Sequence, residues 1–168
     1  IFIAGHKGLV GSALAREAQL NNYDILTRDR SELDLCNRSE VIDFMKEHQP
    51  NWVLIAAAKV GGIYANNTYP ADFLLENLKI QNNLIEASYE AKIDKLLFLG
   101  SSCIFPKITP QPMDEKAILT GPLEKTNEAY SIAKISGIKL CNAYNKQYGT
   151  DFLCVMPSNL YGINDNYH

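Results

Sequence analysis

Short apolar runs alternate with helix-length segments along the whole chain, and this alternation restricts the fold more than any other feature. The apolar runs cover residues 1–4, 23–26, 52–58, 95–101 and 152–156. Between them, the spacing of apolar residues predicts helices over 10–20, 39–48, 70–91 and 127–148. Parallel strands need such helices to return the chain between them. The sequence therefore predicts an α/β domain, a doubly wound Rossmann-like parallel sheet with helices on both faces.

Composition narrows the class of protein further. The 168 residues suit one domain with its own core, and 46% hydrophobic with 21% charged residues is ordinary for a globular protein. A net charge of −3 argues against a nucleic-acid-binding surface, and the apolar runs are too short to predict a membrane span. Cys36, Cys103, Cys141 and Cys154 form no CxxC pair and show no metal-like spacing with histidine. We therefore expect free thiols, no metal site and a cytoplasmic location.

Three glycines separate the first apolar run from the first predicted helix. The segment GHKGLVG holds Gly5, Gly8 and Gly11 at equal spacing. A turn without side chains lets the backbone approach a pyrophosphate, and the helix N-terminus beyond it is partially positive. A plain tight turn is the alternative interpretation. The strand before the glycines and the helix after them favour dinucleotide binding.

Two arginines follow the second apolar run and bear on the choice of dinucleotide. An acidic residue at this point binds the ribose 2′-hydroxyl of NAD, whereas arginine accommodates the 2′-phosphate of NADP. Arg28 and Arg30 flank Asp29 here, and guanidinium groups bind phosphate through paired hydrogen bonds. We expect NADP(H), with a solvated charged loop as the alternative.

Tyr130 and Lys134 lie on one face of the last predicted helix, because they are one helical turn apart. A phenol ordinarily ionises near pH 10, and a neighbouring ammonium group lowers its pKa. Such a pair can exchange a proton with a carbonyl or hydroxyl group during hydride transfer. A packed tyrosine beside a surface lysine is the alternative.

The fourth apolar run ends in two serines and a cysteine, Ser101, Ser102 and Cys103. Doubly wound sheets bind their ligands beyond the carboxyl ends of the strands, the edge at which the Tyr130 helix also begins. A serine hydroxyl there can hydrogen-bond a substrate carbonyl as charge develops on its oxygen. The alternatives are polar turn chemistry for the serines and a small apolar role for the cysteine.

Together these motifs resemble the extended short-chain dehydrogenase/reductase superfamily. Within it, the chain resembles the GDP-L-fucose synthase family over five stretches: FIAGHKGLVGSAL, AAAKVGGIYANNTYPADF, KLLFLGSSCIFPK, TNEAYSIAKISGIKLC and MPSNLYG. The resemblance implies an NADPH-dependent enzyme with a GDP-sugar substrate, which epimerises GDP-4-keto-6-deoxy-D-mannose at C3 and C5 and reduces C4 to give GDP-L-fucose. The alternatives are another nucleotide-sugar epimerase or dehydratase that uses NAD, and a non-catalytic NADP-binding module.

The resemblance also assigns roles to individual residues. Tyr130 is the proton donor to the C4 carbonyl, and Lys134 lowers the pKa of that tyrosine. Ser101 hydrogen-bonds the carbonyl oxygen, and Cys103 is an acid-base group of the epimerisation. Arg30, which begins the RSELDL segment, is preferred for the 2′-phosphate. The implied NADP-binding residues are Gly5, His6, Lys7, Gly8, Leu9, Val10, Gly11, Arg30, Ser31, Glu32, Leu33, Asp34, Leu35, Leu99, Gly100, Ser101, Ser102, Lys134, Pro157, Ser158, Asn159 and Leu160.

The ends of the sequence fall within a strand-like run and just after another. We therefore expect residues 1–168 to be one NADP-binding Rossmann domain cut from a longer protein, with the GDP-sugar-binding domain outside it. The resemblance implies a second acid-base group, a histidine just beyond His168. It also implies a homodimer, in which the helices over 70–91 and 127–148 pair across a two-fold axis.

Overall fold

The computed structural model describes residues 1–165, and their centre is a parallel sheet. Its four strands lie in the order β1-β2-β3-β4, all parallel. They are β1 (Phe2–Ala4), β2 (Trp52–Ile55), β3 (Lys95–Leu99) and β4 (Phe152–Val155). The predicted α/β class and parallel sheet are therefore confirmed. The interpretation of His168 lies outside the described residues.

One predicted strand is wrong. Residues 23–26 form an isolated bridge to β1 and no strand, because only Leu26 exchanges backbone hydrogen bonds there, with Ile1 and Ile3. The chain then enters a turn in which the backbone nitrogens of Glu32 and Leu33 donate to the Asp29 carbonyl. The pairing with β1 therefore stops after one residue. The third predicted strand is also too long: β2 ends at Ile55, and the three alanines after it form a loop.

The helices follow the predicted pattern closely. They are α1 (Leu9–Leu20), α2 (Arg38–His48), α3 (Ile63–Thr68), α4 (Pro70–Glu90) and α5 (Glu128–Tyr148), with 3-10 turns η1 (Ser102–Ile104), η2 (Glu115–Ala117) and η3 (Lys125–Asn127). Pro70 occupies the first turn of α4, where no backbone donor is needed, and Gly149 ends α5 in the left-handed conformation with φ 69°. Two details differ: α2 begins one residue earlier than predicted, at Arg38, and α3 was not predicted.

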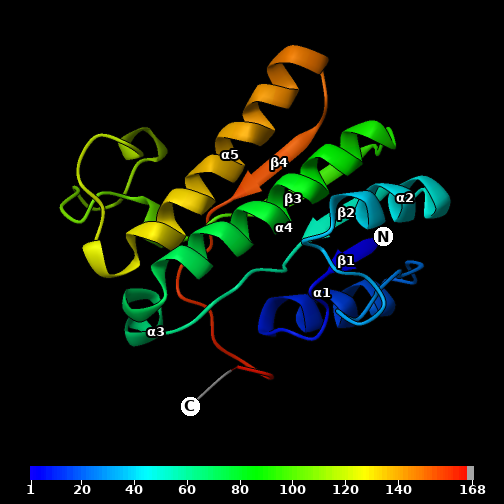
Figure 1. The fold of residues 1–168 in the computed structure, drawn as a ribbon, viewed down its shortest axis with the longest axis horizontal. Helices are drawn as coiled ribbons and strands as arrows, with labels where there is room; N and C mark the ends of the chain where they lie inside the picture. Colours follow the sequence, from blue (N-terminus) through cyan, green and yellow to red (C-terminus); the bar gives the residue numbers. More distant parts are fainter. Residues whose placement is uncertain (166–168) are drawn as a thin grey trace.

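The core lies between the sheet and the layer formed by α2, α4 and α5, which pack side by side (Figure 1). Alternate strand residues, such as Val53, Ile55 and Phe98, are fully buried against these helices. The chain leaves β1 in the opposite direction toward Leu26, so a right-handed crossover places α1 on the other face. That face is open at β4 in the described residues, where Leu153 is 49% exposed.

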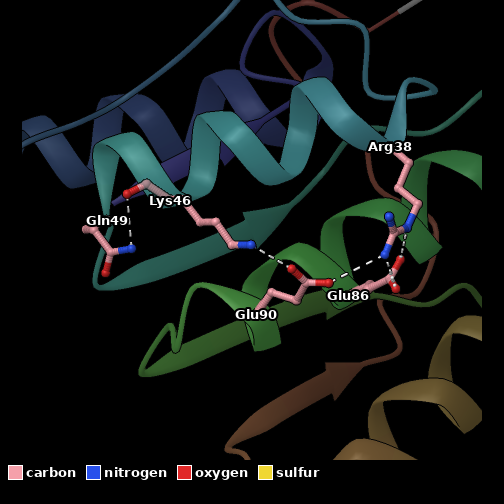
Figure 2. Close-up of polar contacts among 5 residues, drawn as sticks. All are labelled: Arg38, Lys46, Gln49, Glu86 and Glu90. Carbon is pink, nitrogen blue, oxygen red and sulfur yellow. Dashed lines mark hydrogen bonds and ion pairs between the residues drawn. The ribbon is translucent and has the colours of Figure 1, made fainter.

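Surface ion pairs join α2 to α4 (Figure 2). The Arg38 guanidinium donates two hydrogen bonds of 2.7 Å to the Glu86 carboxylate and lies 3.4 Å from Glu90. Lys46 donates to the other oxygen of Glu90 at 2.8 Å. The network holds the two helices in register at the rim of the core. None of the helices within residues 1–165 has both the length and the apolar character needed to cross a membrane.

Candidate active site

In the glycine loop after β1, packing leaves no room for a side chain at two of the three glycines. Gly5 has φ +89°, and a Cβ there would lie 2.6 Å from the backbone nitrogen of Ala57. At Gly11 a Cβ would lie 2.0 Å from the carbonyl oxygen of Gly5, so α1 packs on the loop only because that position lacks a side chain. Gly8 is different, since the nearest atom to its Cβ would be an ordinary 3.5 Å away. Packing therefore requires Gly5 and Gly11, and leaves Gly8 to a ligand-related reason.

A cavity of about 540 Å³ opens beside this loop, at the carboxyl ends of β1 and β2. The predicted cofactor residues that line it are Gly5, Gly8, Leu9, Val10, Arg30, Leu33, Asp34 and Leu35. Sequence reasoning missed the wall formed by the loop after β2, from Ala56 to Val60, and the contribution of Asn164. Asn164 lies against α1, where its amide donates to the Ser12 hydroxyl at 3.0 Å. The volume and the lining suit part of a dinucleotide.

The two arginines differ in how far they are already engaged. Arg28 lies over the Phe44 ring at 5.3 Å and contacts the His48 imidazole at 3.1 Å. Arg30 is 77% exposed and has one ion pair, 3.3 Å to Glu76, which also lines the cavity. The cavity therefore has two guanidinium groups in its lining, of which Arg30 is the more exposed, and contact of Arg30 with a ligand phosphate stays a prediction.

Asp29, between the two arginines, binds the glycine loop. Lys7 donates to its carboxylate at 2.7 Å, and the His6 imidazole lies 3.4 Å away. The hydrogen bond from Lys7 lowers the pKa of Asp29. Because its charge is used by the loop, Asp29 is poorly suited to a ribose hydroxyl, which agrees with the preference for arginine at this site.

The predicted catalytic residues meet where β3 ends and α5 begins. Ser101 precedes η1 and accepts a hydrogen bond from the backbone of Cys103 at 3.3 Å. Ser131 on α5 donates to the Cys103 carbonyl at 2.9 Å, and Lys134 donates to the Leu99 carbonyl at 2.8 Å. These bonds attach both ends of the Ser101–Cys103 turn to the helix that carries Tyr130.

Burial shifts the pKa values of two side chains in this cluster, Tyr130 and Lys134. Burial raises the pKa of Tyr130 to about 12, the nearby Cys103 adds to the increase, and a hydrogen bond with Ser101 partly offsets it. Burial lowers the pKa of Lys134 to about 8. That Lys134 lowers the pKa of Tyr130 stays a prediction: its ammonium group donates to the Leu99 carbonyl and lies 4.8 Å from the centre of the Phe98 ring and 5.7 Å from the centre of the Tyr130 ring.

A second cavity, of about 260 Å³, lies in front of this cluster. Its lining includes Cys103, Asn127 and Tyr130. The loop after β2 and helix α3 supply the rest of the lining: Val60, Gly61, Gly62, Ile63 and Asn66. Val60 lines both cavities, so one loop separates the two spaces. The larger cavity therefore lies beside a smaller one that is lined by Cys103 and Tyr130, the two predicted acid-base residues.

The remaining predicted site residues lie outside the larger cavity. His6, Lys7, Gly11, Ser31 and Glu32 flank it, whereas residues 99–102, Lys134 and residues 157–160 lie near the ends of β3 and β4. Gly100 donates a backbone hydrogen bond of 2.8 Å to Val155, which ties these two strand ends together. Their contact with a cofactor stays a prediction.

The NAD dependent epimerase/dehydratase family matches residues 1–168, the whole chain. The chain belongs to this family. It is 56% identical over 169 residues to GDP-L-fucose synthase 1 of Arabidopsis thaliana, covering 100% of this chain and 52% of that protein. It is 54% identical over 169 residues to the GDP-L-fucose synthase of Escherichia coli strain K12, covering 100% of this chain and 53% of that protein.

Solved structures of family members have the same fold. The GDP-mannoheptose C4 reductase MlghC from Campylobacter jejuni, with NADP bound, is 40% identical with a TM-score of 0.94, covering 98% of this chain and 52% of that one. This chain thus spans about half the length of the curated relatives it matches. The cavities and the Tyr130 cluster therefore belong to the half of a family member that this chain covers.

Proposed function

We propose that the whole protein is an NADPH-dependent 3,5-epimerase and 4-reductase that converts GDP-4-keto-6-deoxy-D-mannose to GDP-L-fucose, and that this chain supplies its cofactor-binding domain. The observation that carries the proposal is that Tyr130 and Cys103 line the same cavity. Ser101 is hydrogen-bonded to Tyr130, and the Lys134 ammonium lies 5.7 Å from the centre of the Tyr130 ring. A plain reductase needs only Tyr130, Ser101 and Lys134. The similarity to GDP-L-fucose synthases supports the same substrate and products.

The reduction step follows from the protonation states in the cluster. NADPH supplies the hydride for C4. Because burial raises the pKa of Tyr130 to about 12, its phenol holds its proton at neutral pH until the carbonyl oxygen becomes basic enough to take it. The Ser101 hydroxyl donates a hydrogen bond to the same oxygen. The Lys134 ammonium then stabilises the phenolate that remains.

Epimerisation needs a base and an acid at carbons 3 and 5, which flank the carbonyl. Their protons are acidic because an enolate forms across C4. Cys103 lies two residues after Ser101 and lines the cavity with Tyr130. Its thiolate removes a proton from one side of the ring, and inversion requires a second group to return one on the other side. That second group lies outside the described residues.

Two substitutions test the separation of these steps in the protein at the full length of its relatives. Tyr130→Phe should abolish NADPH oxidation, while C3 and C5 still exchange with deuterated solvent. Cys103→Ser should instead abolish the exchange. Exchange at the wild-type rate in Cys103→Ser would show that another residue is the base and would remove the reason for preferring an epimerase over a plain reductase.

Cofactor choice is testable on this chain directly. We expect NADPH to bind at least tenfold more tightly than NADH, because a charged hydrogen bond to the 2′-phosphate contributes about 1.5–3 kcal/mol. Arg30→Ala should remove most of that preference and Arg28→Ala much less, measured by calorimetric titration. Equal binding of the two cofactors to the unmodified chain would contradict the assignment to NADP.

We further propose a homodimer through the outer faces of α4 and α5. Leu75 on α4 is 56% exposed and Ile132 on α5 is 38% exposed, which leaves apolar side chains on the surface of two adjacent helices. Ile132→Asp should shift sedimentation toward the monomer. Ile108→Asp is the control, because Ile108 is 91% exposed in the loop between η1 and η2, outside both helices. Unchanged sedimentation in Ile132→Asp would count against this interface. A cytoplasmic location, typical of enzymes with free thiols, is part of the same proposal.

A further inference from the structure

Two buried oxygen atoms on the smaller cavity have no hydrogen-bond partner within residues 1–165. They are the side-chain amide oxygens of Asn66 and Asn127. Both residues line the 260 Å³ cavity with Cys103 and Tyr130, and they come from two different elements, α3 and η3. Buried polar atoms are nearly always paired, so two unpaired acceptors on one small cavity call for an explanation.

The orientation of Asn66 is fixed by its own donors. Its side-chain nitrogen donates to the carbonyl oxygens of Gly61 at 2.8 Å and Gly62 at 3.1 Å. Turning the amide over would set its oxygen against those two carbonyls, so the oxygen must face elsewhere. The residue is only 7% exposed, which keeps bulk water from satisfying that oxygen.

Asn127 is placed by the start of α5. It is the last residue of η3, and its backbone nitrogen donates to the Glu124 carbonyl at 3.2 Å. Tyr130 follows one turn later on the same helix face. A group that contacts the Tyr130 phenol therefore has its neighbouring atoms close to the Asn127 amide.

The chemistry of the two oxygens limits what they bind. Amide oxygens accept hydrogen bonds and cannot donate, so their partner must carry donors. Two further side chains that line the cavity are those of Val60 and Ile63. Both are apolar, so they offer no charge to an ionic ligand. Two separate acceptors in a small uncharged cavity match two neighbouring hydroxyl groups of a neutral sugar ring.

We propose that Asn66 and Asn127 form the subsite for the C2–C3 diol of the hexose, each oxygen accepting a hydrogen bond from one of the two hydroxyl groups. The inference rests on the proposed function, which places the C4 carbonyl at Tyr130 and therefore C3 and C2 next along the ring. The two asparagines would then hold the ring as Cys103 works at C3, and would select sugars that keep both hydroxyls.

The experiment pairs each substitution with the loss of one hydroxyl group. The protein at the full length of its relatives is assayed by NADPH oxidation with the natural substrate and with its 2-deoxy and 3-deoxy analogues. The unmodified enzyme should prefer the natural substrate in kcat/KM by about five- to tenfold over each analogue, the effect of one hydrogen bond. Asn66→Ala and Asn127→Ala should each abolish the preference against one analogue and keep it against the other.

Two controls separate binding from folding. Asn67 neighbours Asn66 on α3 but is exposed, so Asn67→Ala should keep both preferences. Asn127→Asp keeps an acceptor oxygen and should also keep the preference that Asn127→Ala loses. NADPH affinity, measured in the other cavity, reports whether a variant is folded. If Asn66→Ala fails that check, the Asn127 series decides.

The outcomes are distinct. Failure of the unmodified enzyme to reduce the natural substrate would refute the proposed function itself. Activity on that substrate, with both analogue preferences unchanged in folded Asn127→Ala, would overturn the diol subsite while leaving the proposed function standing.

Discussion

Among residues 1–165, Lys134 is the one buried residue with a charged side chain. Its replacement by methionine tests how much the burial of this charge affects the free energy of unfolding. The side chain is 4% exposed, and its ammonium group donates to the Leu99 carbonyl at 2.8 Å. It also lies 4.8 Å from the centre of the Phe98 ring. Burial lowers the pKa of Lys134 from 10.5 to about 8.

The lowered pKa sets both the sign and the size of a stability effect. Between pH 8 and 10.5 the unfolded chain binds more protons at this position than the folded one, so the free energy of unfolding rises with pH in that window. Below pH 8 both states are charged and the cost of burying the ammonium is fully present. At about 1.4 kcal/mol per pH unit, the change across the window is about 3 kcal/mol.

Urea unfolding of the chain and of Lys134→Met, at pH 7 and pH 10.5, measures this contribution. The stability of the unmodified chain relative to Lys134→Met should increase by about 3 kcal/mol between the two pH values. Titration of other groups, including Tyr130, occurs in both proteins and cancels in the difference. Lys139→Met, which changes an exposed lysine on the same helix, should show no such trend. A relative change below about 1 kcal/mol would refute the description of Lys134 as a buried charge.

Further predictions concern the glycine loop and the ion pairs between α2 and α4. Gly11→Ala should unfold the chain or lower its thermal midpoint strongly, because its Cβ would lie 2.0 Å from the Gly5 oxygen, whereas Gly8→Ala should keep the midpoint and weaken NADPH binding. Either result reversed, by calorimetry and titration, would contradict the packing argument. Arg38→Met should lower the urea midpoint only slightly at pH 7 and low salt, since the pair with Glu86 is largely exposed and surface ion pairs contribute little. Arg38 lowers the pKa of Glu86, so that contribution should be present above pH 4.5 and disappear as the pH falls through the lowered value, as followed by urea unfolding.

The elements of the fold could be predicted where periodicity was long and ends were marked. Pro70 and Gly149 stand at helix boundaries and bracket long apolar stripes, so α4 and α5 were found within a residue or two. The segment 23–26 has the composition of a strand, but pairing depends on where the chain goes next. Only Leu26 remains in reach of β1 before the chain turns, and no local pattern records that turn.

The candidate site divides in the same way. The residues whose spacing expresses a geometric need, such as Gly5 and Gly11, were found from the sequence because a Cβ has no room there. Helical spacing places Lys134 on the same face as Tyr130, but it says neither where the ammonium group points nor that burial raises the pKa of Tyr130. Burial and the Leu99 carbonyl decide that, and both are tertiary.

The AAAKVGGI segment, residues 56–63, forms the loop after β2 and the start of α3, and it lines both cavities. Its first half lines the larger cavity and its second half lines the smaller one. Two buried asparagines hold this loop at two points. Asn77 accepts from the Lys59 backbone nitrogen at 2.9 Å and donates to the Lys59 carbonyl at 3.0 Å. Asn66 donates to the carbonyl oxygens of Gly61 and Gly62. A wall shared by two spaces must satisfy the shape of both, so its sequence is constrained from two sides. The same hydrogen bonds that fix this wall leave the Asn66 oxygen without a partner among residues 1–165, and the proposed diol subsite would link this loop to the choice of sugar.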